Sequence, residues 1–203
     1  EMPQTIHDFG GFPKELFDVQ YPAKGSPELA QLTKELILPT EVELDHDWGL
    51  DHGAWSVIKH LYPEANIPVI QMSIDYSLTG QAHFDMAQKL QSLRNKGILI
   101  IGSGNIVHNL RMIDWANFDK DNYGFDWAIE AREKINKNII DGDFANLINY
   151  QKQGKAFDLA IPTPDHYLPL LYTLGLKNES ENIQLFNDKL LAGSLSMTSV
   201  KIG

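Results

Sequence analysis

Apolar residues recur along this chain at two spacings, one typical of helices and one typical of strands. Over residues 82–96, Met86, Leu90 and Leu93 share one face at helical spacing, and Gly97 ends the run. Helices therefore account for a large part of the predicted structure. Similar spacing, together with residues that start and stop helices, predicts further helices over residues 26–36, 53–62, 125–139, 144–150 and 165–174.

Short apolar runs predict strands between these helices. The clearest is Ile98–Ile101, Ile67–Ile74 has the pattern of a second buried strand, and residues 42–44 form a short candidate. Residues 193–202 alternate at period two, which predicts a final strand. The order strand, helix, strand over 67–101 implies a right-handed parallel crossover. We therefore predict an α/β fold with a central mixed, largely parallel sheet flanked by helices, in a single domain because no linker or repeat divides the chain.

The charged residues limit the choice of partner. The sequence has 27 Asp and Glu against 17 Lys and Arg, a net charge of −10, and the acidic residues are scattered. Nucleic acids and anionic membranes both need a concentrated basic surface, so we predict neither as a partner. No apolar run approaches the ~18 residues of a membrane helix, and we expect a cytoplasmic protein. Because the chain has no Cys, any metal must be held by nitrogen and oxygen ligands.

Three histidines, His52, His108 and His166, occur where a strand or turn is predicted to meet a helix. Such positions lie at the rim of a sheet, where metal sites and acid–base groups of α/β proteins are usually found. For each histidine a purely structural role in packing or capping is the alternative. Beside His52, Asp51 could fix the ring tautomer, or it could simply cap the following helix.

The surroundings of His108 and His166 are unusual. His108 follows the turn Gly102-Ser103-Gly104, which would present backbone N–H groups and the imidazole at a strand end. A phosphate cradle is the alternative for this turn, but a third glycine in register and a following acidic residue are not evident. His166 lies on the predicted 165–174 helix between Pro164 and Pro169, which restrict the backbone on both sides.

The remaining histidines carry weaker signals. His7 stands in an aromatic loop, residues 7–12, that could line a pocket. His46 is flanked by two carboxylates, for which an acidic loop is the simpler interpretation. His60 and His83 fall on helix faces, and we expect them to be solvated or half-buried.

Five segments in order closely resemble the class III extradiol ring-cleavage dioxygenases, the LigB-type superfamily. Within that superfamily they are most similar to the bacterial and plant 4,5-DOPA extradiol dioxygenases. The resemblance runs from about Ile6 to Gly203 and is specific because it combines separate motifs in the same order. The segments are residues 6–13, 48–53, 68–75, 104–111 and 163–169.

This resemblance implies an enzyme that cleaves a catechol ring with dioxygen at a mononuclear Fe(II) site, with Zn(II) possible in the same site. By motif, His108 and His166 correspond to metal-site histidines, His52 to a candidate acid–base group, and His7 to a residue near the substrate. The chemistry of the side chains agrees, since imidazole suits both metals and a neutral histidine can accept a catechol proton near pH 7. The resemblance does not specify the natural catechol or the oligomeric state.

The sequence departs from the family at one place. Family members carry an amino-terminal segment with a His-Gly-Ser-Pro turn and a Ser-Ala-His-Trp strand end, each bearing a further metal-site histidine, and neither motif occurs here. We therefore expect residues 1–203 to be the catalytic domain without its amino-terminal metal-ligand segment, with an exposed sheet edge. The alternative function is a non-enzymatic metal-binding or interaction protein on the same fold. A zinc hydrolase would also use histidine ligands, but no added nucleophile or carboxylate base indicates one.

Overall fold

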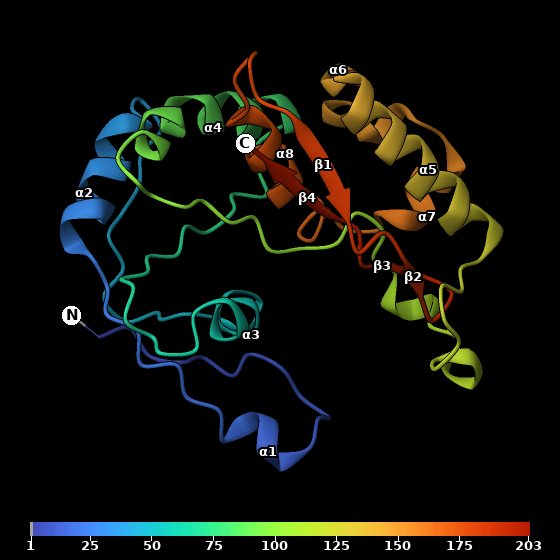
Figure 1. Ribbon diagram of the computed structural model, residues 1–203, viewed down its shortest axis with the longest axis horizontal. Coiled ribbons are helices and arrows are strands. Elements are labelled where there is room, and N and C mark those ends of the chain that lie inside the picture. Colours follow the sequence, from blue (N-terminus) through green and yellow to red (C-terminus); the bar gives the residue numbers. More distant parts are fainter. Residues whose placement is uncertain (1) are drawn as a thin grey trace. The chain divides into compact units, whose positions relative to one another are not determined.

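The computed structural model describes residues 2–203, and the chain divides into two compact units, Glu1–Ser73 and Ile74–Gly203. We call them the N-terminal unit and the C-terminal unit and describe each by itself. In Figure 1 the N-terminal unit runs from blue to green and the C-terminal unit from green to red. Helices are the main regular elements of both units, and the strands of the described residues lie near the end of the C-terminal unit.

The N-terminal unit combines short helices with a small apolar core. Ser26 starts one helix as predicted, because its hydroxyl accepts a hydrogen bond from the Leu29 backbone N–H at 3.2 Å and Pro27 occupies the first helical position. The helices are α1 (Lys14–Phe17), α2 (Pro27–Leu36) and α3 (His52–Leu61). One buried cluster of this unit consists of Tyr21, Ala23, Leu50, Trp55 and Ile58.

Helix packing forms the core of the C-terminal unit. On α5, Ala128, Ala131, Ile135 and Ile139 are fully buried at helical spacing and share one cluster with Leu171 of α8. Burial of each large aliphatic side chain contributes about 1.5–3 kcal/mol. The helices are α4 (Gly80–Arg94), α5 (Asp126–Asp141), α6 (Phe144–Ile148), α7 (Lys155–Ala160) and α8 (Leu168–Gly175), with 3₁₀ turns η1 (Leu110–Met112), η2 (Trp115–Asn117) and η3 (Tyr150–Lys152).

The strands of the C-terminal unit form two antiparallel pairs. Strand β1 (Ile183–Phe186) pairs with β4 (Ser199–Ile202), and β2 (Leu190–Leu191) pairs with β3 (Leu195–Ser196). The strand predicted over 193–202 is therefore confirmed in two pieces, β3 and β4. These pairs and the surrounding helices confirm an α/β chain.

The predicted central parallel sheet is not seen among residues 2–203. Residues 42–44, Ile67–Ile74 and Ile98–Ile101 form neither helix nor strand. The run at 98–101 is not buried as predicted, since Leu99 is 64% and Ile101 41% exposed. An apolar run indicates a preference for burial, but a strand also needs a neighbouring backbone to bond with, and these segments have no such ladder in the described part of the chain.

Helix α8 begins later than the sequence predicts. The backbone N–H groups of Tyr167 and Leu168 both donate to the Pro164 carbonyl at 2.9 Å, so a turn precedes the helix. Proline is favoured in the first turn of a helix, where its missing N–H needs no partner, and Pro169 marks that position. The prediction that His166 lies on this helix is therefore wrong, because His166 lies in the turn before α8.

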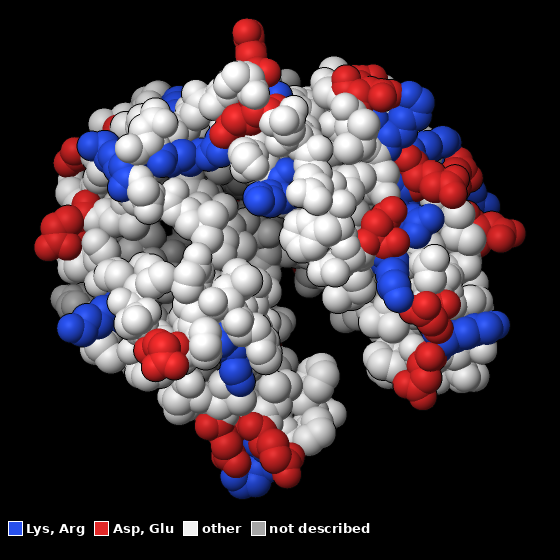
Figure 2. Space-filling model, viewed as in Figure 1, with Lys and Arg blue, Asp and Glu red and all other residues white. Residues whose placement is uncertain are grey.

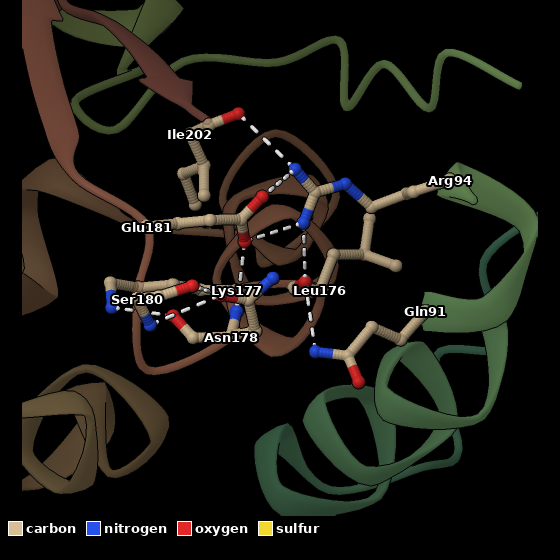
Figure 3. Close-up of polar contacts among 8 residues, drawn as sticks. All are labelled: Gln91, Arg94, Leu176, Lys177, Asn178, Ser180, Glu181 and Ile202. Atoms are coloured by element: carbon tan, nitrogen blue, oxygen red, sulfur yellow. Dashed lines mark hydrogen bonds and ion pairs between the residues drawn. The ribbon is translucent and has the colours of Figure 1, made fainter. Parts of the chain in front are cut away.

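Arg94 ties the end of α4 to the C-terminal segment of the chain (Figure 3). Its guanidinium donates to the Leu176 carbonyl at 2.8 Å and forms a bidentate pair with Glu181, while Nη2 also reaches the Ile202 carbonyl at 3.4 Å. The hydrogen bond from Arg94 is the main cause that lowers the pKa of Glu181 below its usual value. One side chain therefore links α4, α8 and β4.

Charged side chains are mixed over the face shown in Figure 2, where Lys and Arg lie among Asp and Glu without a continuous basic area. This distribution on that face agrees with the scattered charges in the sequence. Among the described residues, no helix combines the length and the apolar composition that crossing a membrane requires.

His83 is fully buried, which contradicts the prediction of a solvated or half-buried side chain. It lies on the same stripe of α4 as Met86 and Leu90, and its Nδ1 hydrogen-bonds the Tyr172 hydroxyl at 3.0 Å. Burial lowers the pKa of His83, because the charged ring would lose its hydration. The folded chain therefore keeps this ring neutral to a lower pH than the unfolded chain does.

A pH dependence of stability follows from this burial. As the pH falls from 7 to 5, the unfolded chain binds a proton at His83 before the folded chain does, so the free energy of unfolding falls. We expect His83→Gln, which cannot titrate, to lose less stability over this range than the wild type, by up to about 1.4 kcal/mol per pH unit. Urea unfolding at pH 5, 6 and 7 measures the difference. Equal losses of stability in the two proteins would contradict the lowered pKa of His83.

Candidate functional site

His108 and His166 are brought together in the C-terminal unit. Their rings stack with centroids 3.5 Å apart and planes within 10°. His108 is fixed by its backbone N–H, which donates to the Ala160 carbonyl at the end of α7 at 2.8 Å, and by a bridge to Leu195 of β3. The two histidines that were predicted to share a site are therefore in contact.

The glycine-rich turn before His108 lies directly against the His166 segment. The Asn105 backbone N–H donates to the His166 carbonyl at 2.8 Å, and the Asn105 side chain donates to the Ser196 carbonyl at 2.7 Å. A Cβ atom on Gly104 would lie 2.2 Å from the His166 carbonyl oxygen, and one on Gly102 would lie 2.5 Å from the Pro169 carbonyl oxygen. Close backbone approach, without any phosphate, is sufficient reason for both glycines.

Asp165 orients the ring of His166. The carboxylate bonds to Nδ1 of His166, and both side chains are about one-third exposed. Burial raises the pKa of Asp165, but hydrogen bonds from Thr163 and His166 and the nearby His166 ring lower it to a net value below the usual range. With Nδ1 held by a carboxylate, Nε2 of His166 is left to bind a ligand, which is the arrangement typical of metal-binding histidines.

His108 is neutral at pH 7. Burial is the main cause, and the neighbouring His166 adds to it, so the pKa of His108 falls from 6.5 to about 4. A neutral imidazole keeps the lone pair that a metal ion or a proton requires. The pair His108 and His166 thus presents nitrogen donors beside a carboxylate.

In chemical type, imidazole nitrogens are donors that suit divalent metal ions such as Fe(II) and Zn(II). Within residues 2–203, no group of three or more His, Asp and Glu side chains is placed to share a metal ion. Catalytic metal sites commonly use three protein ligands, so His108 and His166 alone would supply only part of such a ligand set.

His52 lies in the N-terminal unit as the first residue of α3, and its partner is Asp8. One oxygen of Asp8, Oδ1, accepts from the His52 backbone N–H at 3.0 Å and bonds to the His52 Nδ1 at 2.8 Å. Asp51, which the sequence offered for this role, instead caps α3 by accepting from the Ala54 N–H at 2.9 Å and binds the Gln71 amide at 2.7 Å. The capping alternative for Asp51 is therefore correct.

His7 also belongs to the N-terminal unit and lies in an aromatic cluster. Its Nε2 bonds to the Val19 carbonyl at 2.9 Å, and its ring contacts Phe9, Phe17 and Trp55 at centroid distances of 5.9, 6.3 and 5.7 Å. The aromatic loop predicted from residues 7–12 is thus partly folded on the core of its unit.

Sequence reasoning missed Asp8 as a partner of His52. The two residues are 44 positions apart, so no local spacing could pair them. The one sequence signal for this role was the position of Asp8 in the aromatic loop of residues 7–12, which was predicted to line a pocket. His46 and His60 are exposed.

Comparison with known proteins agrees with the sequence motifs. A protein of Escherichia coli described as 4,5-DOPA dioxygenase extradiol is 46% identical over 207 residues, which cover all of this chain and 75% of that protein. A protein of Beta vulgaris with the same description is 33% identical, over 99% of this chain and 75% of its own length.

A solved structure is similar as well. The crystal structure of an uncharacterized protein from Escherichia coli matches with a TM-score of 0.83 and 40% sequence identity, covering 99% of this chain and 81% of that chain. Residues 1–197 match the family described as the catalytic LigB subunit of aromatic ring-opening dioxygenase. This chain therefore belongs to the LigB family of aromatic ring-opening dioxygenases.

Proposed function

We propose that this protein is an extradiol dioxygenase that opens the ring of a DOPA-like catechol with dioxygen. The observation that carries the proposal is the contact between His108 and His166, with Asp165 behind His166, in segments characteristic of the family. The names of the two relatives above support DOPA as the model substrate. The described residues would act as the catalytic domain.

His108 and His166 would hold the metal, which we propose to be Fe(II), with Zn(II) as a second occupant of the same ligands. Their donor atoms are neutral imidazole nitrogens, which suit either ion. When bound by these residues, Fe(II) would supply the redox chemistry that the reaction of dioxygen with a catechol requires. Asp165 keeps the His166 ring in the tautomer that leaves Nε2 available.

Ring cleavage also requires a group that removes a proton from the catechol. We assign this step to His52, whose Nδ1 is bonded to Asp8 and whose Nε2 can accept the proton. The aromatic side chains around His7 would provide an apolar surface for a planar ring, and we place His7 near the substrate.

Oxygen uptake by the metal-loaded protein tests this function. The full-length gene product is loaded anaerobically with Fe(II) and mixed with DOPA and air, and the consumption of oxygen and the formation of the yellow ring-opened product are recorded. We expect one dioxygen to be consumed per catechol, with both oxygen atoms in the product. The Zn(II)-loaded protein is the control, because zinc has no redox chemistry and should consume no oxygen. Bound Fe(II) without oxygen uptake on any catechol would refute the proposal.

Replacing His52 separates proton transfer from metal binding. We expect His52→Ala to bind the metal as the wild type does and to lose turnover by about 10²- to 10⁴-fold, the usual contribution of a general acid–base group. His60→Ala is a matched control, because His60 lies on the same helix α3 and is exposed. Metal analysis and steady-state kinetics measure the two effects. Loss of the metal in His52→Ala would show that the assigned roles are wrong.

A further inference from the structure

We propose that Asp8 is a positioning residue that fixes the tautomer of His52 and makes its Nε2 the proton acceptor. The role of His52 itself rests on the function proposed above. Asp8, His52 and the residues that hold them all lie in the N-terminal unit.

The geometry of Asp8 permits a single neutral tautomer of His52. Its Oδ1 bonds both the backbone N–H and the ring Nδ1 of His52, at 3.0 and 2.8 Å. An ionised carboxylate only accepts hydrogen bonds, so Nδ1 of the neutral ring must carry the hydrogen. The lone pair of the ring then lies on Nε2, where a substrate proton can be taken up.

The loop that carries Asp8 is itself fixed. Trp55, a buried residue of α3, donates its indole N–H to the Ile6 carbonyl at 2.8 Å, and the Ile6 N–H donates to the Leu50 carbonyl at 2.8 Å. Phe9 meets the His52 ring edge to face, with centroids 5.6 Å apart. The carboxylate and the imidazole are therefore held from both sides of their hydrogen bond.

The charge of Asp8 also acts on the protonated ring. Burial raises the pKa of Asp8, but the hydrogen bonds from His52 outweigh it, and the net pKa lies below the usual value, so the carboxylate is ionised at neutral pH. His52 stands at the N-terminus of α3, where the helix dipole disfavours a positive charge. The adjacent negative charge of Asp8 offsets this effect when Nε2 takes up a proton.

Asp51 cannot substitute for Asp8. Its oxygens are engaged by the Ala54 N–H and the Gln71 amide, and it contributes to the start of α3 and not to the ring of His52. The two carboxylates near His52 thus have separate tasks.

The test combines NMR with kinetics on the full chain. In ¹⁵N-labelled protein the His52 ring signals, assigned by their loss in His52→Gln, report which nitrogen carries the hydrogen. We expect the Nδ1–H tautomer in the wild type and in Asp8→Asn, whose amide oxygen can accept both N–H groups. In Asp8→Ala we expect a mixture of tautomers.

The kinetic effects should follow the same order. We expect kcat to fall by about 10-fold in Asp8→Asn, which loses only the charge, and by about 100-fold in Asp8→Ala, with little change in KM. Asp18→Asn is the control, because Asp18 is an exposed carboxylate of the same unit that pairs with Lys14.

An unchanged tautomer in Asp8→Ala would overturn the proposal, and an unchanged kcat in Asp8→Asn would overturn the role of the charge. If Asp8→Ala does not fold, the Asp8→Asn kinetics still decide that role. If the wild type consumes no oxygen, the proposed function fails, while the NMR measurement still decides whether Asp8 sets the tautomer.

Discussion

The His166→Ala variant should bind Fe(II) or Zn(II) more than about 100-fold more weakly than the wild type. Removing the group behind a metal-binding histidine typically lowers metal affinity by about 10- to 100-fold, and removing the histidine itself should cost more. Of the two proposed ligands, His166 has the more complete support, because Asp165 bonds its Nδ1 and leaves Nε2 available to a metal. Anaerobic titration against a competing chelator measures the affinity, and turnover should be lost with the metal.

Three further variants identify the cause of that loss. Asp165→Asn should lower the metal affinity by about 10- to 100-fold, because it removes the negative charge beside His166 while the side chain keeps its size. His60→Ala should bind as the wild type does, since His60 is exposed on α3. His108→Ala should also weaken binding. Wild-type affinity in His166→Ala would exclude it as a ligand, and a His108→Ala variant that keeps the metal but does not turn over would place His108 in proton transfer.

Helices were largely predictable from the sequence because their signals are local. Ser26 and Pro27 mark the start of α2, and the apolar stripe of α4 repeats within a few residues. The same stripe contained a signal for the burial of His83, which stands three residues before Met86 and seven before Leu90. A helical position of that kind indicates burial even when the residue is polar.

Strand pairing was not predictable, because it depends on neighbours that a single run does not specify. Ile98–Ile101 is as apolar as a buried strand, yet Leu99 is largely exposed and the run has no strand partner among residues 2–203. The short antiparallel pairs that do form are local in sequence: a turn joins β2 to β3, and these two strands lie between β1 and β4.

The candidate site was predictable as residue types and motifs and not as contacts. The resemblance named His108 and His166 together, and the structure places their rings in contact. The sequence left open whether Asp51 orients the His52 ring or caps the following helix, and Asp51 caps α3. The carboxylate that reaches the ring comes from a loop far away in sequence.

The Gly104→Ala variant should lose both stability and turnover. The added Cβ would lie 2.2 Å from the His166 carbonyl oxygen and 3.0 Å from its carbon, and backbone atoms cannot rotate away as a side chain can. Either the 102–108 turn or the His166 turn must move, so we expect the free energy of unfolding to fall by about 1–3 kcal/mol. A shift of about 1 Å between His108 and His166 is enough to lower turnover by about 100-fold.

Ser103→Ala is the matched control for this variant, because Ser103 is an exposed residue of the same turn and its replacement adds no atom. Urea unfolding of the metal-free proteins separates the packing effect from metal binding. Titration of the folded variant with Fe(II) then measures its metal affinity. Wild-type stability together with wild-type affinity in Gly104→Ala would mean that the turn can shift without cost. In that case the glycines would need another explanation, and the phosphate alternative for residues 102–104 would have to be tested by direct binding of inorganic phosphate.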